Sequence, residues 1–71
     1  MECVIHITWD DEAAVWIATS DDVPGLVLES GSYDALVERV HAAVPELLQL
    51  NRKPSVFSIL MTSQRRQTVY E

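Results

Sequence analysis

Residues 10–28, DDEAAVWIATSDDVPGLVL, contain two apolar runs of the kind that form strands, with short acidic turns beside them. The second turn leads into Val23-Pro24-Gly25-Leu26. Proline fixes φ and removes a backbone donor, whereas glycine tolerates positive φ, so these four residues predict a tight and rigid corner. A meander this compact, at the start of a chain of 71 residues, favours a small interaction module over an enzyme.

The strand patterns extend on both sides of this stretch. In Cys3–Trp9 apolar side chains alternate with more polar ones, which predicts a half-buried strand. Ala14–Ser20 predicts a second strand, and Leu26–Ser30 a third, shorter one. Trp9 and Trp16 flank the first acidic turn, so we expect them to lie near each other across a hairpin. Tryptophan is enriched both in cores and at interfaces, so Trp9 and Trp16 are candidates to anchor either one.

A helix is predicted after the third strand. Ser32 is a suitable N-cap, and Asp34 lies favourably in the first turn. Apolar residues then recur at helical spacing, namely Tyr33, Leu36, Val37, Val40, Val44, Leu47 and Leu48. Pro45 interrupts this pattern, because its ring clashes with the preceding turn. Either the helix kinks there or Pro45 begins a second short helical piece that ends near Asn51, and we expect the kink.

The strongest strand pattern in the C-terminal part is Val56–Thr62, VFSILMT. We expect its apolar side chains to belong to the core. If the strand lies at a sheet edge, its unpaired backbone groups are also available to pair with another chain. Residues 64–71 either extend the strand or form a tail. The predicted order is β-β-β-α-β, a single α+β domain over residues 1–71 in which one kinked helix packs on one face of a mostly antiparallel sheet.

Composition and charge predict association with other proteins. The chain is 48% hydrophobic, and a domain of this size buries only about 60% of the surface that its unfolded chain exposes. We therefore expect a homodimer or a higher homo-oligomer. The net charge of −6 disfavours direct binding of nucleic acid and favours a basic protein partner. A secretory leader and a membrane-spanning run are not evident, so we expect no membrane association and a cytoplasmic location.

The residues with chemical potential do not form a recognisable catalytic or metal site. The acidic pairs at residues 10–11 and 21–22 occupy turn positions, where aspartate makes local hydrogen bonds. Cys3 has no base on its own strand face, and four converging zinc ligands are not evident. The bases at residues 65–66 are interpreted as a solvated strand end rather than an RNA-binding site. We expect a non-enzymatic protein with no catalytic residues, no metal and no cofactor.

Four motifs carry a family resemblance: Trp9-Asp10-x-Glu12-Ala13, Val15-Trp16-x-Ala18-Thr19-Ser20, Asp22-Val23-Pro24-Gly25-Leu26 and Pro45-Glu46-Leu47-Leu48-x-Leu50-Asn51. Together they resemble the HicB-like antitoxin family, in particular its short single-domain relatives of unknown function. The Pro-Gly corner and Asp34-Ala35-Leu36 also match the broader pattern of a Pro-Gly turn followed by an acid-Ala-Leu helix start. The resemblance extends from residue 4 to residue 51.

The resemblance implies a partial RNase H-like fold with the order β-β-β-α-β. Similar proteins neutralise a small basic toxin that has a double-stranded-RNA-binding-like fold and cleaves messenger RNA. They cover its active surface and perform no chemistry. Full antitoxins of this type usually carry a C-terminal DNA-binding domain. Here the residues after Asn51 must also supply the fourth strand, so we expect no separate DNA-binding domain.

The leading hypothesis is a HicB-like antitoxin, or a protein derived from one, that masks a small basic toxin. The alternative is a stand-alone homo-oligomeric module that is regulatory or binds a ligand, without a toxin partner. A metal-dependent nuclease is a third, less favoured hypothesis. The predicted partner-facing residues are Asp10, Asp11, Trp16, Asp21, Asp22, Pro24 and Gly25.

Overall fold

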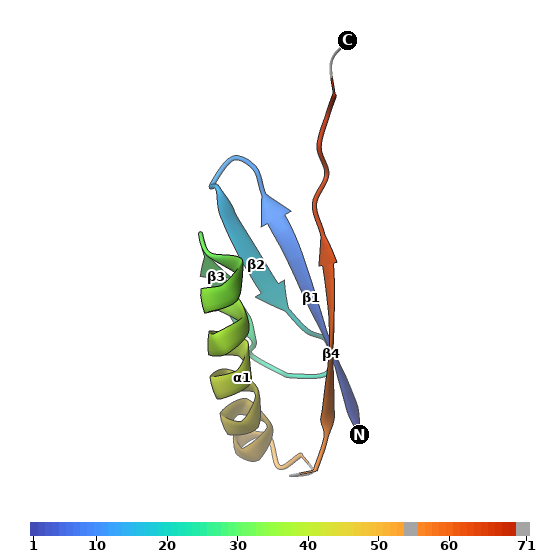
Figure 1. Cartoon of the computed structure of the whole chain (residues 1–71). Coiled ribbons are helices and arrows are strands. Elements are labelled where there is room, and N and C mark those ends of the chain that lie inside the picture. The colour runs from blue at the N-terminus through green and yellow to red at the C-terminus, as the bar shows by residue number, and fades with distance from the viewer. Residues whose placement is uncertain (54–55, 70–71) are drawn as a thin grey trace.

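The chain folds into a four-stranded sheet with one helix packed on one of its faces, as a computed structural model shows (Figure 1). The structure describes residues 1–53 and 56–69. Its elements are β1 (Glu2–Asp10), β2 (Val15–Thr19), β3 (Val27–Ser30), α1 (Tyr33–Leu50) and β4 (Ser58–Gln64). The predicted α+β class and β-β-β-α-β order are confirmed, and each predicted strand boundary lies within two residues of the observed one.

The sheet has the order β3-β2-β1-β4 and is mixed. β2 is antiparallel to both β1 and β3, whereas β4 pairs with β1 in parallel. The predicted, mostly antiparallel arrangement holds for β1, β2 and β3, and the pair of β1 and β4 is the parallel exception. The reason is that α1 returns the chain to the end of the sheet where β3 began, so β4 runs in the same direction as β3 and β1.

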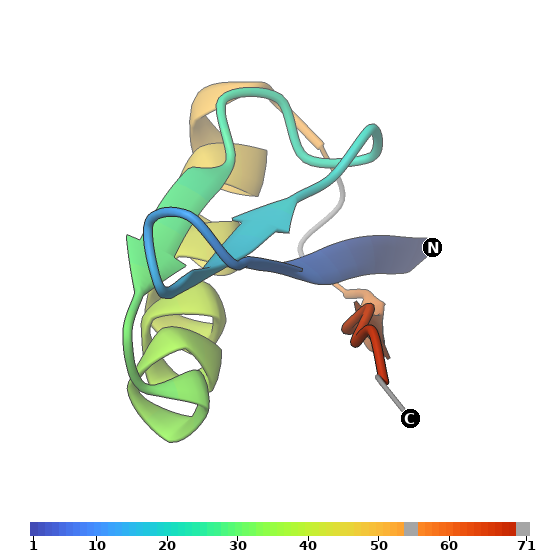
Figure 2. The ribbon, with the colours of Figure 1, turned by 90° about the horizontal axis from the view of Figure 1, so that it is seen from above.

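The core lies between the sheet and α1, and the predicted patterns account for it. Cys3, Ile5 and Ile7 are buried on the helix-facing side of β1, as the alternation in Cys3–Trp9 predicts. The buried residues of the helix are Leu36, Val40, Val44 and Leu48. Seen from above, α1 stands on one side of the sheet and away from β4 (Figure 2). It packs over β2 and β3, so the β4 side of this face is less covered.

The Pro-Gly corner has the predicted geometry. The N–H of Leu26 donates to the carbonyl of Val23 over 3.2 Å, which closes a four-residue turn. Gly25 has a φ of 85°, the left-handed value that the third residue of a type II turn requires. This corner turns the chain between β2 and β3 and places the buried Val23 and Leu26 in the core.

The helix is one continuous element from Tyr33 to Leu50, with Pro45 inside it. The Ser32 side chain accepts a hydrogen bond from the N–H of Ala35, which confirms the predicted N-cap. The alternative in which Pro45 starts a second helical piece is wrong, while a kink at Pro45 stays a prediction. Pro45 is exposed, so its ring takes no place in the core. No helix in the described residues has the length and hydropathy that crossing a membrane requires.

We expect Pro45→Ala to stabilise the fold. Proline costs about 3 kcal/mol more than alanine in a helix interior, and the greater freedom of the unfolded variant returns about 1 kcal/mol of this. The free energy of unfolding, measured by urea denaturation, should rise by about 2 kcal/mol. Glu46→Ala, at the next exposed helix position, is the control and should change it by less than about 0.5 kcal/mol. A loss of stability in Pro45→Ala would show that the proline ring makes a contact that the fold needs.

Candidate functional site

The structure divides the predicted partner-facing residues into two groups at opposite ends of β2. The first group, Asp10, Asp11 and Trp16, lies at the β1–β2 turn. The second group, Asp21, Asp22, Pro24 and Gly25, lies in the loop from β2 to β3. Because β2 separates the two turns, these residues do not converge on one site. Within the described part of the chain, the titratable side chains form no group of three or more that would hold a metal ion.

At the β1–β2 turn the two aspartates have different tasks. Asp10 accepts hydrogen bonds at Oδ1 from the N–H groups of Glu12 (3.0 Å) and Ala13 (3.2 Å), as turn aspartates commonly do. Asp11 instead accepts the indole N–H of Trp9 over 3.1 Å. Asp10 therefore shapes the turn, while Asp11 is exposed and orients an aromatic side chain.

At the other end of β2, the side chain of Asp22 is hydrogen-bonded to the backbone of β1. β2 stops pairing at Thr19, and the side chains after it satisfy the backbone of Val4. Asp22 Oδ2 accepts a hydrogen bond from the N–H of Val4 (2.8 Å), and the Ser20 hydroxyl donates one to the carbonyl of Val4 (2.7 Å). Asp22 is half-buried, whereas Asp21 is exposed, so only Asp21 of this pair stands free on the surface.

The Cys3 thiol does not have the environment of a nucleophile. It is buried in the core, and this burial raises its pKa above the ordinary value. The carboxylate of Asp22 raises the pKa further, because a second negative charge nearby is unfavourable. A thiol held in its protonated form is a poor attacking group, since the thiolate is the reactive species.

Three aromatic rings and one arginine meet at the end of the sheet that carries the β1–β2 turn. Trp9 and Trp16 face each other across the hairpin with ring centroids 5.2 Å apart, so their predicted proximity is confirmed. Tyr33, the first residue of α1, lies 5.1 Å from Trp16 in an edge-to-face arrangement. The guanidinium of Arg65 lies 4.4 Å from the centroid of Trp9 and 5.9 Å from that of Trp16. We call Trp9, Trp16 and Tyr33 the aromatic corner.

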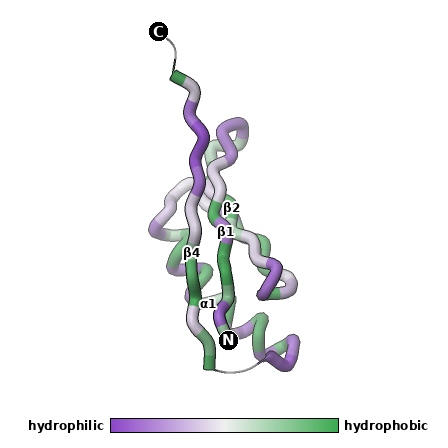
Figure 3. Tube along the Cα trace, turned by 90° about the vertical axis from the view of Figure 1, so that its right-hand side faces the viewer, coloured by the Kyte–Doolittle hydropathy of each residue, from purple (hydrophilic) through white to green (hydrophobic). Residues whose placement is uncertain are grey.

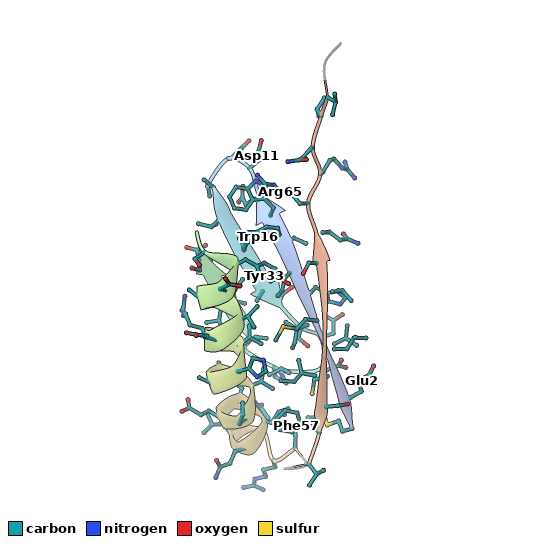
Figure 4. All side chains as sticks on the ribbon, in the orientation of Figure 1. Glu2, Asp11, Trp16, Tyr33, Phe57 and Arg65 are labelled. Carbon is teal, nitrogen blue, oxygen red and sulfur yellow. The ribbon has the colours of Figure 1, made fainter. Side chains whose placement is uncertain are left out.

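Figure 4 shows how this corner is assembled from distant parts of the chain. Asp11, Arg65, Trp16 and Tyr33 lie at one end of the molecule, whereas Glu2 and Phe57 lie at the other. The Tyr33 hydroxyl forms a hydrogen bond of 2.5 Å with Ser63 in β4, which links the start of the helix to the last strand. Sequence reasoning did not include Tyr33 or Arg65 in the site. Arg65 follows the Thr8–Gln64 pair of the parallel register, so it reaches Trp9 only through the β1–β4 pairing.

The outer edge of the sheet at β4 is a second candidate surface. β4 is the terminal strand, and in the described residues it has one neighbour, β1. Its sequence, SILMTSQ, contains no charged residue. Apolar side chains in it and shortly before it are exposed, namely Leu60 (48%) and Val56 (83%). Figure 3 shows β1 and the first part of β4 side by side as largely hydrophobic stretches, while the end of β4 and the residues directly after it are more hydrophilic.

The four aspartates of the two turns do not form one acidic surface. Asp10 shapes a turn, Asp11 orients Trp9, and Asp22 completes the hydrogen bonds of β1. Asp21 is exposed and free of such contacts among the described residues. Adjacent aspartates have the same chemistry but differ in role, because their side chains point in different directions and meet different partners. The negative charge acts at long range as a sum, whereas Asp11 is the carboxylate that the structure places against the aromatic corner.

Asp22 and Asp21 offer a matched test of the two roles that the structure separates. Asp22→Ala should lower the free energy of unfolding by about 1–3 kcal/mol, because the N–H of Val4 loses a charged acceptor. Asp21→Ala should change it by less than about 0.5 kcal/mol. Urea denaturation followed by circular dichroism measures both. Equal effects of the two substitutions would contradict the structural role assigned to Asp22.

Comparisons with known proteins support the fold and give no activity. The chain is similar to a crystal structure of hypothetical protein TTHA1013 from the extremely thermophilic bacterium Thermus thermophilus. The two share 31% sequence identity over 100% of both chains, with a TM-score of 0.77. Among curated proteins, none matches this chain. The model of one family, described as a domain of unknown function (DUF1902), matches residues 2–70, and this chain therefore belongs to that family.

Proposed function

We propose that this protein is a cytoplasmic, non-enzymatic interaction module of the HicB-like antitoxin type, which masks a small basic toxin that cleaves messenger RNA. The observation that carries the proposal is the open β4 edge on an acidic domain. An edge strand presents unpaired backbone groups to a partner, and exposed apolar side chains beside it add affinity. The β-β-β-α-β order, which the resemblance to HicB-like antitoxins implies, also supports it.

The charge of the domain favours a basic partner. The net charge is −6, and acidic side chains are exposed around the sheet and along the helix, namely Asp11, Asp21, Glu29, Asp34, Glu38 and Glu46. A field of this sign speeds the encounter with a basic protein and opposes the encounter with nucleic acid. A nuclease that binds RNA needs basic residues for its phosphate contacts. An acidic cover over those residues would block RNA without any chemistry.

A second candidate, the stand-alone homo-oligomer, is favoured by the composition of β4. Natural edge strands often carry charges that prevent pairing with an identical strand. The segment Ser58–Gln64 carries none, so two copies can pair edge to edge without like charges facing each other. In this case the two sheets would join into one, and a regulatory or ligand-binding role would belong to the oligomer.

Affinity purification from the native host, followed by mass spectrometry, distinguishes the two candidates. The toxin proposal predicts a small basic protein in stoichiometric amount, whose expression alone arrests growth and degrades messenger RNA. Co-expression with the present chain should restore growth. Recovery of the chain as a homo-oligomer, with no such protein, would overturn the toxin proposal in favour of the second candidate.

Leu60→Lys tests whether β4 is the docking edge. The new charge on an exposed edge position should weaken partner binding at least tenfold, or prevent self-association, and leave the fold intact. Thr19→Lys adds the same charge at an exposed position of the interior strand β2 and is the control. Isothermal titration with the partner, or analytical ultracentrifugation for self-association, gives the readout. If both variants bind as the wild type does, the interface lies elsewhere.

A further inference from the structure

The aromatic corner has the composition of a site for a cationic side chain. Trp9, Trp16 and Tyr33 follow one another along the corner with neighbouring ring centroids 5.2 Å and 5.1 Å apart. Cations are attracted to the faces of such rings, and indole is the strongest of them. The carboxylate of Asp11 lies at the same end, hydrogen-bonded to the indole N–H of Trp9. Aromatic faces with a nearby carboxylate favour a positive charge by two separate electrostatic effects.

The corner is held in place by contacts that do not involve a ligand. Asp11 fixes the orientation of Trp9, and the edge-to-face packing holds Trp16 between Trp9 and Tyr33. The hydroxyl of Tyr33 is held by Ser63. A site whose rings are already oriented loses little conformational freedom on binding.

Arg65 shows which cation fits this corner. Its guanidinium lies 4.4 Å from the centroid of Trp9, and the planar guanidinium group stacks on aromatic faces better than an ammonium does. Arg65 is nevertheless exposed, and it follows the end of β4 in a segment without regular secondary structure. An exposed cation–π contact is worth only about two- to fivefold in an equilibrium constant. Arg65 therefore holds the corner with only a small free-energy advantage, and its presence weakens the binding of a competing arginine about three- to sixfold.

The segment that carries Arg65 leaves room for such a competitor. Asp11 and residues 65–69 line an open depression beside the corner. Residues 65–69 extend away from the body of the domain (Figure 1). Movement of this segment would uncover the ring of Trp9 without breaking the pairing of β4 with β1, which ends at Gln64.

We propose that the aromatic corner is a binding site for an arginine side chain of a basic protein partner, and that Arg65 occupies this site in the free protein. The identity of the partner rests on the proposed function, whereas the site itself does not. Binding exchanges one guanidinium for another and changes no covalent bond. The net charge of −6 adds long-range attraction for a partner that presents arginine.

The chain contains two tryptophans, and both belong to the corner, so their indole N–H signals report on it directly. We would titrate ¹⁵N-labelled protein with acetyl-arginine amide at constant ionic strength and follow these signals by NMR. Arg65→Ala removes the competing side chain. Half-saturation should therefore occur at a concentration about three- to sixfold lower than in the wild type. Acetyl-citrulline amide, which has the same shape without the charge, should produce no saturable shift.

Two further variants isolate the cause. Arg66→Ala removes an equally charged and exposed neighbour and should titrate like the wild type. Asp11→Asn in the Arg65→Ala background should weaken binding, because the carboxylate charge is lost. The proposal is overturned if citrulline acts as arginine does, if the shifts never saturate, or if Arg65→Ala and Arg66→Ala have the same midpoint.

If a variant fails to fold, the side-chain signal of Arg65 in the wild-type protein still tests its displacement. As acetyl-arginine amide is added to the wild type, the Arg65 side-chain Nε–H signal should move toward the value of a free arginine. The Arg66 signal serves as the internal reference. An unchanged Arg65 signal at indole saturation would overturn the displacement. Arginine binding at the corner without any recoverable basic partner would contradict the proposed function and leave this site standing.

Discussion

The parallel pairing of β4 with β1 is the interaction on which the rest of the structure depends. It joins residues 2–8 to residues 58–64 and places Ile59 and Met61 beside Cys3 and Ile5 on the helix-facing side. Without it, β1 would have a neighbour on one side only, and its buried residues would lose cover. The same pairing makes β4 the terminal strand and brings Arg65 next to Trp9. The core, the open edge and the occupied aromatic corner thus follow from one register.

The position of α1 explains why one side of the sheet is open to partners. The helix packs over β2 and β3, which are the strands nearest to its own start in the chain. On the β4 side, Phe57, Ile59 and Met61 pack against the core and remain half-buried. A domain of this size has too little chain to cover both halves of a sheet face. Association at β4 would cover what the single helix leaves exposed, and this physical need is common to both proposed functions.

Local patterns in the sequence were sufficient to predict most of the elements. Alternation in Cys3–Trp9, the Pro-Gly corner and the apolar stripe of the helix depend on residues that are close in the chain, so their physical consequences are visible there. The proximity of Trp9 and Trp16 followed for the same reason, since a short turn joins their strands. Asp11 and Trp16 are the residues of the candidate site that these local patterns predicted.

The tertiary structure alone decided the direction of β4, the role of Asp22 and the identity of the fourth side chain at the corner. Each depends on contacts between segments that are far apart in the chain, such as Arg65 with Trp9 and Tyr33 with Ser63. The alternation of apolar and polar residues in a strand does not determine which strand it pairs with or in which direction. The same alternation fits a parallel and an antiparallel neighbour. The continuity of the helix through Pro45 is also a tertiary result, since the buried stripe on its other side holds the helix together across the proline.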